Sequence, residues 1–135
     1  MRVAGILLVL LLAGGIAVGA RNLTATDSDR AVRVVGGDAD RGRQTIVHEG
    51  CGTCHTIPGV TGADGKVGPP LVDFAERGFI AGELPNTAAN LVRWILDPQD
   101  VEPGTAMPDL GLSRQAAADV AAFLYTLGSR DRSDR

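Results

Sequence analysis

One stretch of five residues carries the side chains that could do chemistry in this chain, Cys51-Gly52-Thr53-Cys54-His55. Its two thiols are the only cysteines among 135 residues, and a histidine follows the second directly. This spacing is typical of c-type haem attachment. Each thiol can add to a vinyl group of the porphyrin, and His55 is then placed to bind the iron. The motif therefore predicts one haem c, covalently held by Cys51 and Cys54.

Two other chemistries also use a C-x-x-C pair. A thioredoxin-like redox pair needs a βαβ context, whereas this sequence has Gly and Pro clusters and helical patches around the pair. A structural zinc site needs four ligands, and the only other histidine is His48. Both chemistries remain as alternatives to haem attachment.

The iron also needs a ligand opposite His55, or it keeps an open site. Met107 lies in the loop Pro103-Gly104-Thr105-Ala106-Met107-Pro108, between two prolines that stiffen it. A thioether on such a loop is a suitable soft ligand, and His/Met ligation favours electron transfer over oxygen binding. We therefore predict Met107 as the second axial ligand. The other candidates are His48, just before the attachment motif, and Met1.

An apolar N-terminal run predicts export. Residues 3–20 contain no charged or strongly polar side chain, and Arg2 and Arg21 flank them. At ~1.5 Å per residue they could nearly cross a ~30 Å hydrocarbon core, although residues 18–20 also resemble a signal-peptide cleavage site. We expect residues 1–21 to be a transmembrane anchor or a signal segment. The rest would lie on the periplasmic face of a bacterial inner membrane, or be soluble in the periplasm after cleavage.

The remaining sequence predicts a flexible linker at 22–36, one all-α domain at 37–129 and a disordered tail at 130–135. Expected helices run from Asp38 to Glu49, from Asn86 or Thr87 to Leu96, and from Ser113 to about Leu127, with a short one at 71–76. Residues 56–70 and 101–111 are expected to be loops, and no strand is expected. A domain this small buries little apolar surface, so an apolar cofactor at its centre would add to its stability.

Charge and residue types limit the possible functions. Residues 37–128 contain twelve acidic and six basic side chains, a net charge of −6. An acidic surface argues against nucleic acid as a partner. No residue set resembles an acid–base pair or an activated nucleophile, so we expect no independent catalysis.

Taken in order and spacing, the motifs resemble those of class I cytochromes c, from about Gly37 to Gly128. The matching segments are Gly42, Cys51–His55, Gly68-Pro69-Pro70-Leu71, Asn90–Ile95, Pro103–Pro108 and Asp119–Leu124. The resemblance implies a cytochrome c fold of short helices and loops around the haem. It also implies that the first and last helices cross, with Gly42 allowing close contact near Phe123.

The resemblance implies further roles around the haem. The carbonyl of Pro69 would accept a hydrogen bond from the ligand histidine and orient its ring. Arg77 would lie near a haem propionate, and Leu71 and Trp94 would contact the haem, Trp94 on the methionine side. A solvated surface charge is the alternative for Arg77, and plain core packing is the alternative for Trp94.

The pattern looks most like the small cytochrome domains associated with haem–copper oxidases. It implies a one-electron carrier between a quinol-oxidising complex or dehydrogenase and a terminal oxidase. The alternatives are an electron-entry subunit of a periplasmic dehydrogenase and a ligand-binding or sensor cytochrome. The lysine ring of mitochondrial relatives has no counterpart here. A small uncharged docking patch is expected instead, made of Gly52, Thr53, Thr56, Ile57, Pro58, Thr105 and Ala106.

Overall fold

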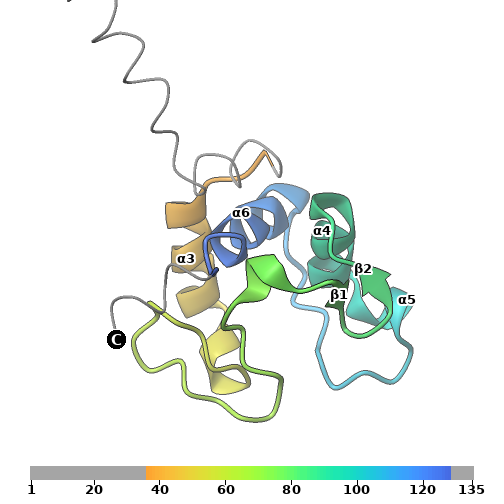
Figure 1. Ribbon diagram of the computed structural model, residues 1–135, viewed down its shortest axis with the longest axis horizontal. Helices are drawn as coiled ribbons and strands as arrows, with labels where there is room; N and C mark the ends of the chain where they lie inside the picture. Colours follow the sequence, from red (N-terminus) through yellow and green to blue (C-terminus); the bar gives the residue numbers. More distant parts are fainter. Residues whose placement is uncertain (1–35, 129–135) are drawn as a thin grey trace, which may run out of the picture.

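Helices supply most of the regular structure in residues 36–128, which are the residues that the computed structural model describes (Figure 1). The order is α3 (Ala39–His48), η1 (Cys51–Thr53), η2 (Phe74–Glu76), β1 (Phe79–Ile80), β2 (Leu84–Pro85), α4 (Ala88–Leu96), α5 (Pro98–Val101) and α6 (Arg114–Leu124), where η marks a 3-10 helix. The predicted segment 1–21, nearly all of the linker and the tail at 130–135 lie outside the described residues. Within 36–128, no helix is long and apolar enough to cross a membrane.

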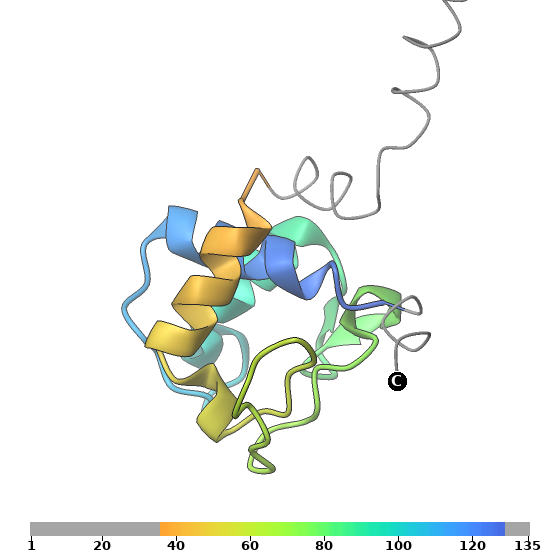
Figure 2. The same cartoon turned by 90° about the vertical axis from the view of Figure 1, so that its left-hand side faces the viewer.

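The crossing of α3 over α6 is the most extensive contact between elements, and Figure 2 shows α3 lying across α6. Gly42 and Ile46 are the buried residues of α3. A Cβ on Gly42 would lie only 1.9 Å from the carbonyl oxygen of Asp119, so only glycine permits this approach. The contact falls on Asp119 and Val120. The closest approach of Gly42 is therefore at the middle of α6, one helical turn before Phe123, rather than beside Phe123 as expected.

Side-chain caps begin the three longer helices where the sequence predicts them. Asp38, Thr87 and Ser113 each accept a hydrogen bond from the backbone N–H three residues further on. Such caps satisfy backbone donors that have no partner inside the helix. The helix predicted to reach Leu127 ends at Leu124, because tight turns follow it.

Two elements differ from the sequence-based expectation. Residues 79–85 form an antiparallel hairpin, β1 paired with β2, so the expectation of no strand is wrong there. Its turn places Ala81 and Gly82 at positive φ, 54° and 82°. No helix was expected between Leu96 and the loop at 101–111, yet Pro98 begins the short helix α5, whose first turn is capped by the side chain of Asp97. Proline suits that position because its missing N–H would have no helical partner.

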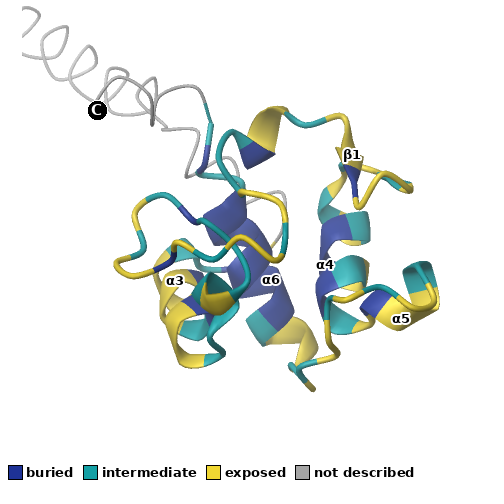
Figure 3. Ribbon diagram, turned by 90° about the horizontal axis from the view of Figure 1, so that it is seen from below, coloured by how far each residue is buried: buried dark blue, intermediate teal, exposed yellow. Residues whose placement is uncertain are grey.

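The buried side chains gather on α6 and on the side of α4 that faces it (Figure 3). In α4 these are Leu91, Val92 and Ile95. In α6 the alanines Ala117 and Ala121 are fully buried, and such small residues let the neighbouring helices come close. The short helix expected at 71–76 is the single 3-10 turn η2, whose Phe74 is buried and packs edge-on against the ring of Tyr125.

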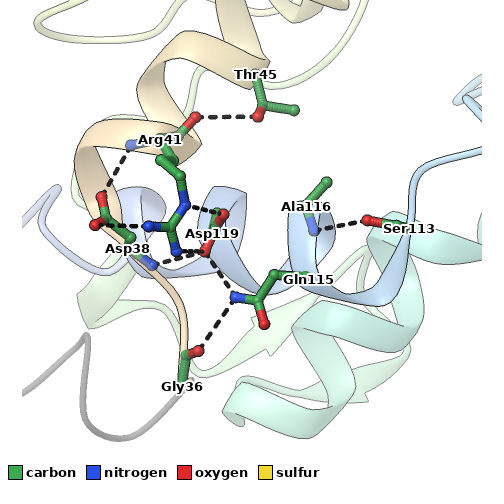
Figure 4. A network of polar contacts seen from close by, with 8 residues as sticks. All are labelled: Gly36, Asp38, Arg41, Thr45, Ser113, Gln115, Ala116 and Asp119. Carbon is green, nitrogen blue, oxygen red and sulfur yellow. Dashed lines mark hydrogen bonds and ion pairs between the residues drawn. The ribbon is translucent and has the colours of Figure 1, made fainter.

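A buried carboxylate joins the start of α3 to α6 (Figure 4). Asp119 is only 4% exposed. Its oxygens accept hydrogen bonds from Arg41 Nε and Nη2 at 2.8 and 3.1 Å and from the N–H of Asp38 at 2.7 Å. Gln115 Nε2 adds a fourth at 2.9 Å. Burial alone would raise the pKa of Asp119, but these donors outweigh it and hold the pKa below its usual value.

We predict that Asp119→Asn lowers the free energy of unfolding by about 2 kcal/mol at neutral pH, because an amide cannot accept every one of these hydrogen bonds. A depressed pKa means that the carboxylate stabilises the fold above its ordinary pKa of about 3.9, and that this stabilisation disappears as the pH falls through the lower folded value. The difference between the two proteins should therefore shrink at acid pH. Denaturant titrations across pH measure it, with Asp40→Asn, on the exposed side of α3, as the matched control. An equal loss at every pH would contradict this role.

Candidate haem-binding site

The two thiols and the histidine lie on one tight turn at the end of α3. Gly50 leaves the helix with a positive φ of 68°, and η1 follows at once. The carbonyl of Cys51 accepts hydrogen bonds from the N–H groups of Cys54 and His55, at 3.2 and 3.0 Å. These two hydrogen bonds to one carbonyl wrap the backbone into a tight turn, and all three side chains start from that turn.

The loop at 56–70 folds back and packs on this turn. The N–H of Gly65 donates to the carbonyl of Gly52 at 3.0 Å, and the N–H of Gly68 donates to the carbonyl of Cys54 at 2.8 Å. A Cβ on Gly65 would lie 2.4 Å from the carbonyl oxygen of Thr53. The loop that the sequence predicts here is therefore a fixed support for the attachment turn.

The imidazole of His55 is oriented by this loop. Its Nδ1 donates a hydrogen bond to the carbonyl oxygen of Pro69 at 2.8 Å. A carbonyl can only accept, so Nδ1 carries the proton and Nε2 keeps the lone pair that binds a metal. A Cβ on Gly68 would lie 2.3 Å from Cε1 of the ring, so the imidazole rests directly on the glycine.

The two cysteines are free thiols and half-buried. Burial raises the pKa of the Cys51 thiol above its usual value. His48, which a zinc site would recruit, is 84% exposed at its side chain and pairs with Glu49 instead. Among residues 36–128, no three His, Cys, Asp or Glu side chains gather as metal ligands do. Two thiols and one oriented imidazole on a single turn fit a covalently attached haem better than a four-ligand zinc site.

The other predicted site residues lie in separate segments. Leu71 and Trp94 are partly buried and pack against the core cluster. Met107 is half-buried in the loop that follows α5. In Figure 1 this pale-blue loop lies at the lower right, and the yellow-green loop at 56–70, which packs on the attachment turn, lies at the lower left.

Arg77 is half-buried and holds the chain just after Pro69. Its Nη2 donates to the carbonyls of Pro70 and Val72, and its guanidinium lies 5.3 Å from the centre of the Phe74 ring. Burial lowers its pKa below the usual arginine value. Arg77 is thus more than a solvated surface charge, while its contact with a haem propionate stays a prediction.

Sequence reasoning missed Asn86 as part of the support for this region. Its Nδ2 donates to the carbonyls of Phe74 and Arg77, both at 3.0 Å, and its Oδ1 accepts from the hydroxyl of Tyr125 at 2.9 Å. The amide thereby connects η2, the hairpin and the end of α6. An asparagine just before a helix is typical of a helix cap, so the residues around Asn86 give no sign of these contacts.

Comparison with known proteins now decides the family. The family model for cytochrome c matches residues 39–128, about two thirds of the chain. The chain belongs to the cytochrome c family. Its domain is therefore a cytochrome c domain, mostly helical with one small hairpin, and has a haem-containing electron-transfer role. The family implies a covalently bound haem, which agrees with the thiols and histidine described above.

Two relatives are named cytochrome c oxidase subunit 2. The one from Alkalihalophilus pseudofirmus is 41% identical over 90 residues, which cover 66% of this chain and 25% of the relative. The one from Bacillus sp. (strain PS3) is 35% identical over 66 residues, which cover 47% of this chain and 18% of the relative. The chain thus spans a quarter or less of each relative. No solved structure matches it.

The docking patch expected around the cytochrome's haem edge needs one correction. Ile57 is only 2% exposed, because its side chain turns into the core and its N–H bonds to the carbonyl of Ala63. It therefore forms no part of the surface. Thr53 and Ala106 are exposed, so uncharged side chains from the attachment turn and from the methionine loop do reach the surface.

We predict that Gly68→Ala disturbs the site, because the added methyl would have to push the His55 ring from its place. The free energy of unfolding of the haem-loaded protein should fall by at least about 2 kcal/mol. Denaturant titration followed by haem absorption measures the loss. Gly78→Ala is the control, since nothing lies within 4 Å of a Cβ there, and should change stability by less than about 0.5 kcal/mol. Equal effects of the two substitutions would show that His55 does not rest on Gly68.

Proposed function

We propose that this cytochrome c domain carries single electrons through one haem c, attached to Cys51 and Cys54, with His55 and Met107 as the axial ligands. The observation that carries the proposal is the hydrogen bond from His55 Nδ1 to the Pro69 carbonyl. It fixes the tautomer that leaves Nε2 as the ligand atom, as groups behind metal-binding histidines do.

The haem, when bound, supplies a reversible one-electron couple. The protein's own residues decide how that couple is used. His55 is held by a hydrogen bond on one side and by Gly68 beneath it, so it needs little rearrangement between oxidation states. The thioether of Met107, as a ligand, would raise the reduction potential and would leave no open position for oxygen. These features support electron transfer rather than catalysis by the domain alone.

We further propose a haem–copper terminal oxidase as the electron acceptor. Two relatives of this domain are named as oxidase subunits, which supports such a partner. The donor would be a quinol-oxidising complex or a dehydrogenase. Residues 1–21 would anchor the domain to the periplasmic face of a bacterial inner membrane, or would be removed to leave a soluble periplasmic carrier.

Met107→Ala tests the axial ligand. The variant should keep its covalent haem, seen by pyridine haemochrome spectroscopy and intact mass. It should lose the weak far-red absorption of iron–thioether ligation, have a lower reduction potential and bind carbon monoxide in the reduced state. His48→Ala is the control, because His48 is exposed, and it should keep the far-red band. The assignment fails if the band survives Met107→Ala. A protein without haem would contradict the whole proposal.

The uncharged surface near the attachment turn gives a prediction for partner binding. Oxidation of the reduced full-length protein by a purified haem–copper oxidase should change less than about threefold between about 0.01 and 0.15 M salt, over which the Debye length falls from about 30 to about 8 Å. Stopped-flow absorption measures the rate. A steep loss of rate with salt would mean that a charged surface governs docking.

A further inference from the structure

The side-chain amide of Gln99 closes the loop that carries Met107. Its Nε2 donates to the carbonyl of Thr105 at 2.8 Å and to the carbonyl of Met107 itself at 3.3 Å. Its Oε1 accepts from the N–H of Gly104 at 3.0 Å. One side chain thus binds three backbone groups of the same short loop.

The chemistry of these partners fixes the orientation of the amide. The carbonyls of Thr105 and Met107 can only accept, and the N–H of Gly104 can only donate. Rotating the amide by half a turn would place its oxygen against two carbonyls and its NH₂ against an N–H. The network is therefore complementary in one direction alone, as expected of a side chain that sets the shape of a loop.

Gln99 itself stands on a well-supported element. It lies on α5, whose neighbouring Pro98 is fully buried and whose N-terminus is capped by Asp97. Arg93 Nη2 binds Asp100 Oδ2 at 2.9 Å and so connects α5 to α4. The amide of Gln99 therefore stands on a short helix that is itself connected to α4, the helix that carries Trp94.

The loop has few other restraints near the methionine. The N–H of Thr105 donates to the carbonyl of Glu102 at 3.1 Å, and Gly104 turns the chain with a φ of 88°. The N–H of Met107 has only a long contact, 3.4 Å, to Thr105 Oγ1. Without Gln99, the methionine would be restrained mainly by the prolines on either side of the loop.

We propose that Gln99 is a positioning residue for the axial ligand, which holds the Met107 backbone so that the thioether stays on the iron. The inference rests on the proposed function, in which Met107 binds that iron. It adds that the strength of the axial methionine ligand depends on a side chain eight positions before it, whose hydrogen bonds reach the loop backbone.

Competition with an added ligand tests this in the haem-loaded, full-length ferric protein. Gln99→Ala removes all three hydrogen bonds, so imidazole should displace the methionine with about tenfold higher apparent affinity at neutral pH. The variant should keep the haem content of the wild type. Gln99→Glu should behave in the same way, because a carboxylate cannot donate to the two carbonyls. Gln44→Glu, the same change at an exposed position of α3, is the matched control and should match the wild type.

The pH dependence of Gln99→Glu separates positioning from general destabilisation. When the introduced carboxyl is protonated, near its ordinary pKa of about 4.3, it can donate to one carbonyl and still accept from the N–H of Gly104. The far-red band, relative to the wild type at the same pH, should therefore be weak at pH about 7 and recover towards pH about 4. Gln99→Ala should show no such recovery.

The outcomes distinguish this inference from the proposed function. If the wild type has no far-red band, or keeps it in Met107→Ala, the axial ligand assignment is wrong. If the band depends on Met107 while both Gln99 variants match the wild type in imidazole affinity, the positioning role is overturned and the ligand assignment stands. Weakened ligation without recovery of Gln99→Glu at acid pH would also overturn positioning, because a merely structural defect behaves in that way.

Discussion

The contact between α3 and α6 determines where the turn with the proposed haem-binding residues starts. Gly42 lets the two backbones meet, and Asp119 binds the beginning of α3 through the N–H of Asp38 and the guanidinium of Arg41. The attachment turn follows α3 after a single left-handed residue, Gly50. Its position is therefore fixed by how α3 lies on α6, and a shift of that helix would carry both thiols and the histidine with it.

The two proposed iron ligands are supported by different chemistry. His55 rests on Gly68 and donates to a backbone carbonyl, so its support acts on the ligand side chain directly. The Met107 thioether donates no hydrogen bond and accepts only weakly, so hydrogen bonds orient this side chain poorly. Its support has to act on the backbone, and Gln99 does so by binding the carbonyl of the residue. The orientation of a thioether ligand therefore depends on how the backbone of its loop is held.

The sequence predicted the parts of this structure that depend on neighbouring residues. The caps at Asp38, Thr87 and Ser113 are local, and the family resemblance implied the bond between His55 and Pro69. The hairpin at 79–85 and the helix α5 were missed because strands of two residues and a helix of four are too short to show a period. The contacts of Asn86 and Gln99 were missed for another reason. They join side chains to backbone groups whose positions exist only once the chain has folded.

The start of the domain has a mechanical consequence. The carbonyl of Gly36 accepts from Gln115 Nε2, and a Cβ on Gly37 would lie 2.1 Å from the carbonyl oxygen of Ala118, so the chain enters the domain pressed against α6. The attachment turn lies at the other end of α3, about 15 Å away for ten residues of helix. A force pulling on the chain before residue 36 would be borne first by α6 and the Asp119 contacts. The proposed iron ligands would feel that load only once those contacts broke and α3 moved on α6, so the Asp119 contacts stand between the chain before residue 36 and the attachment turn.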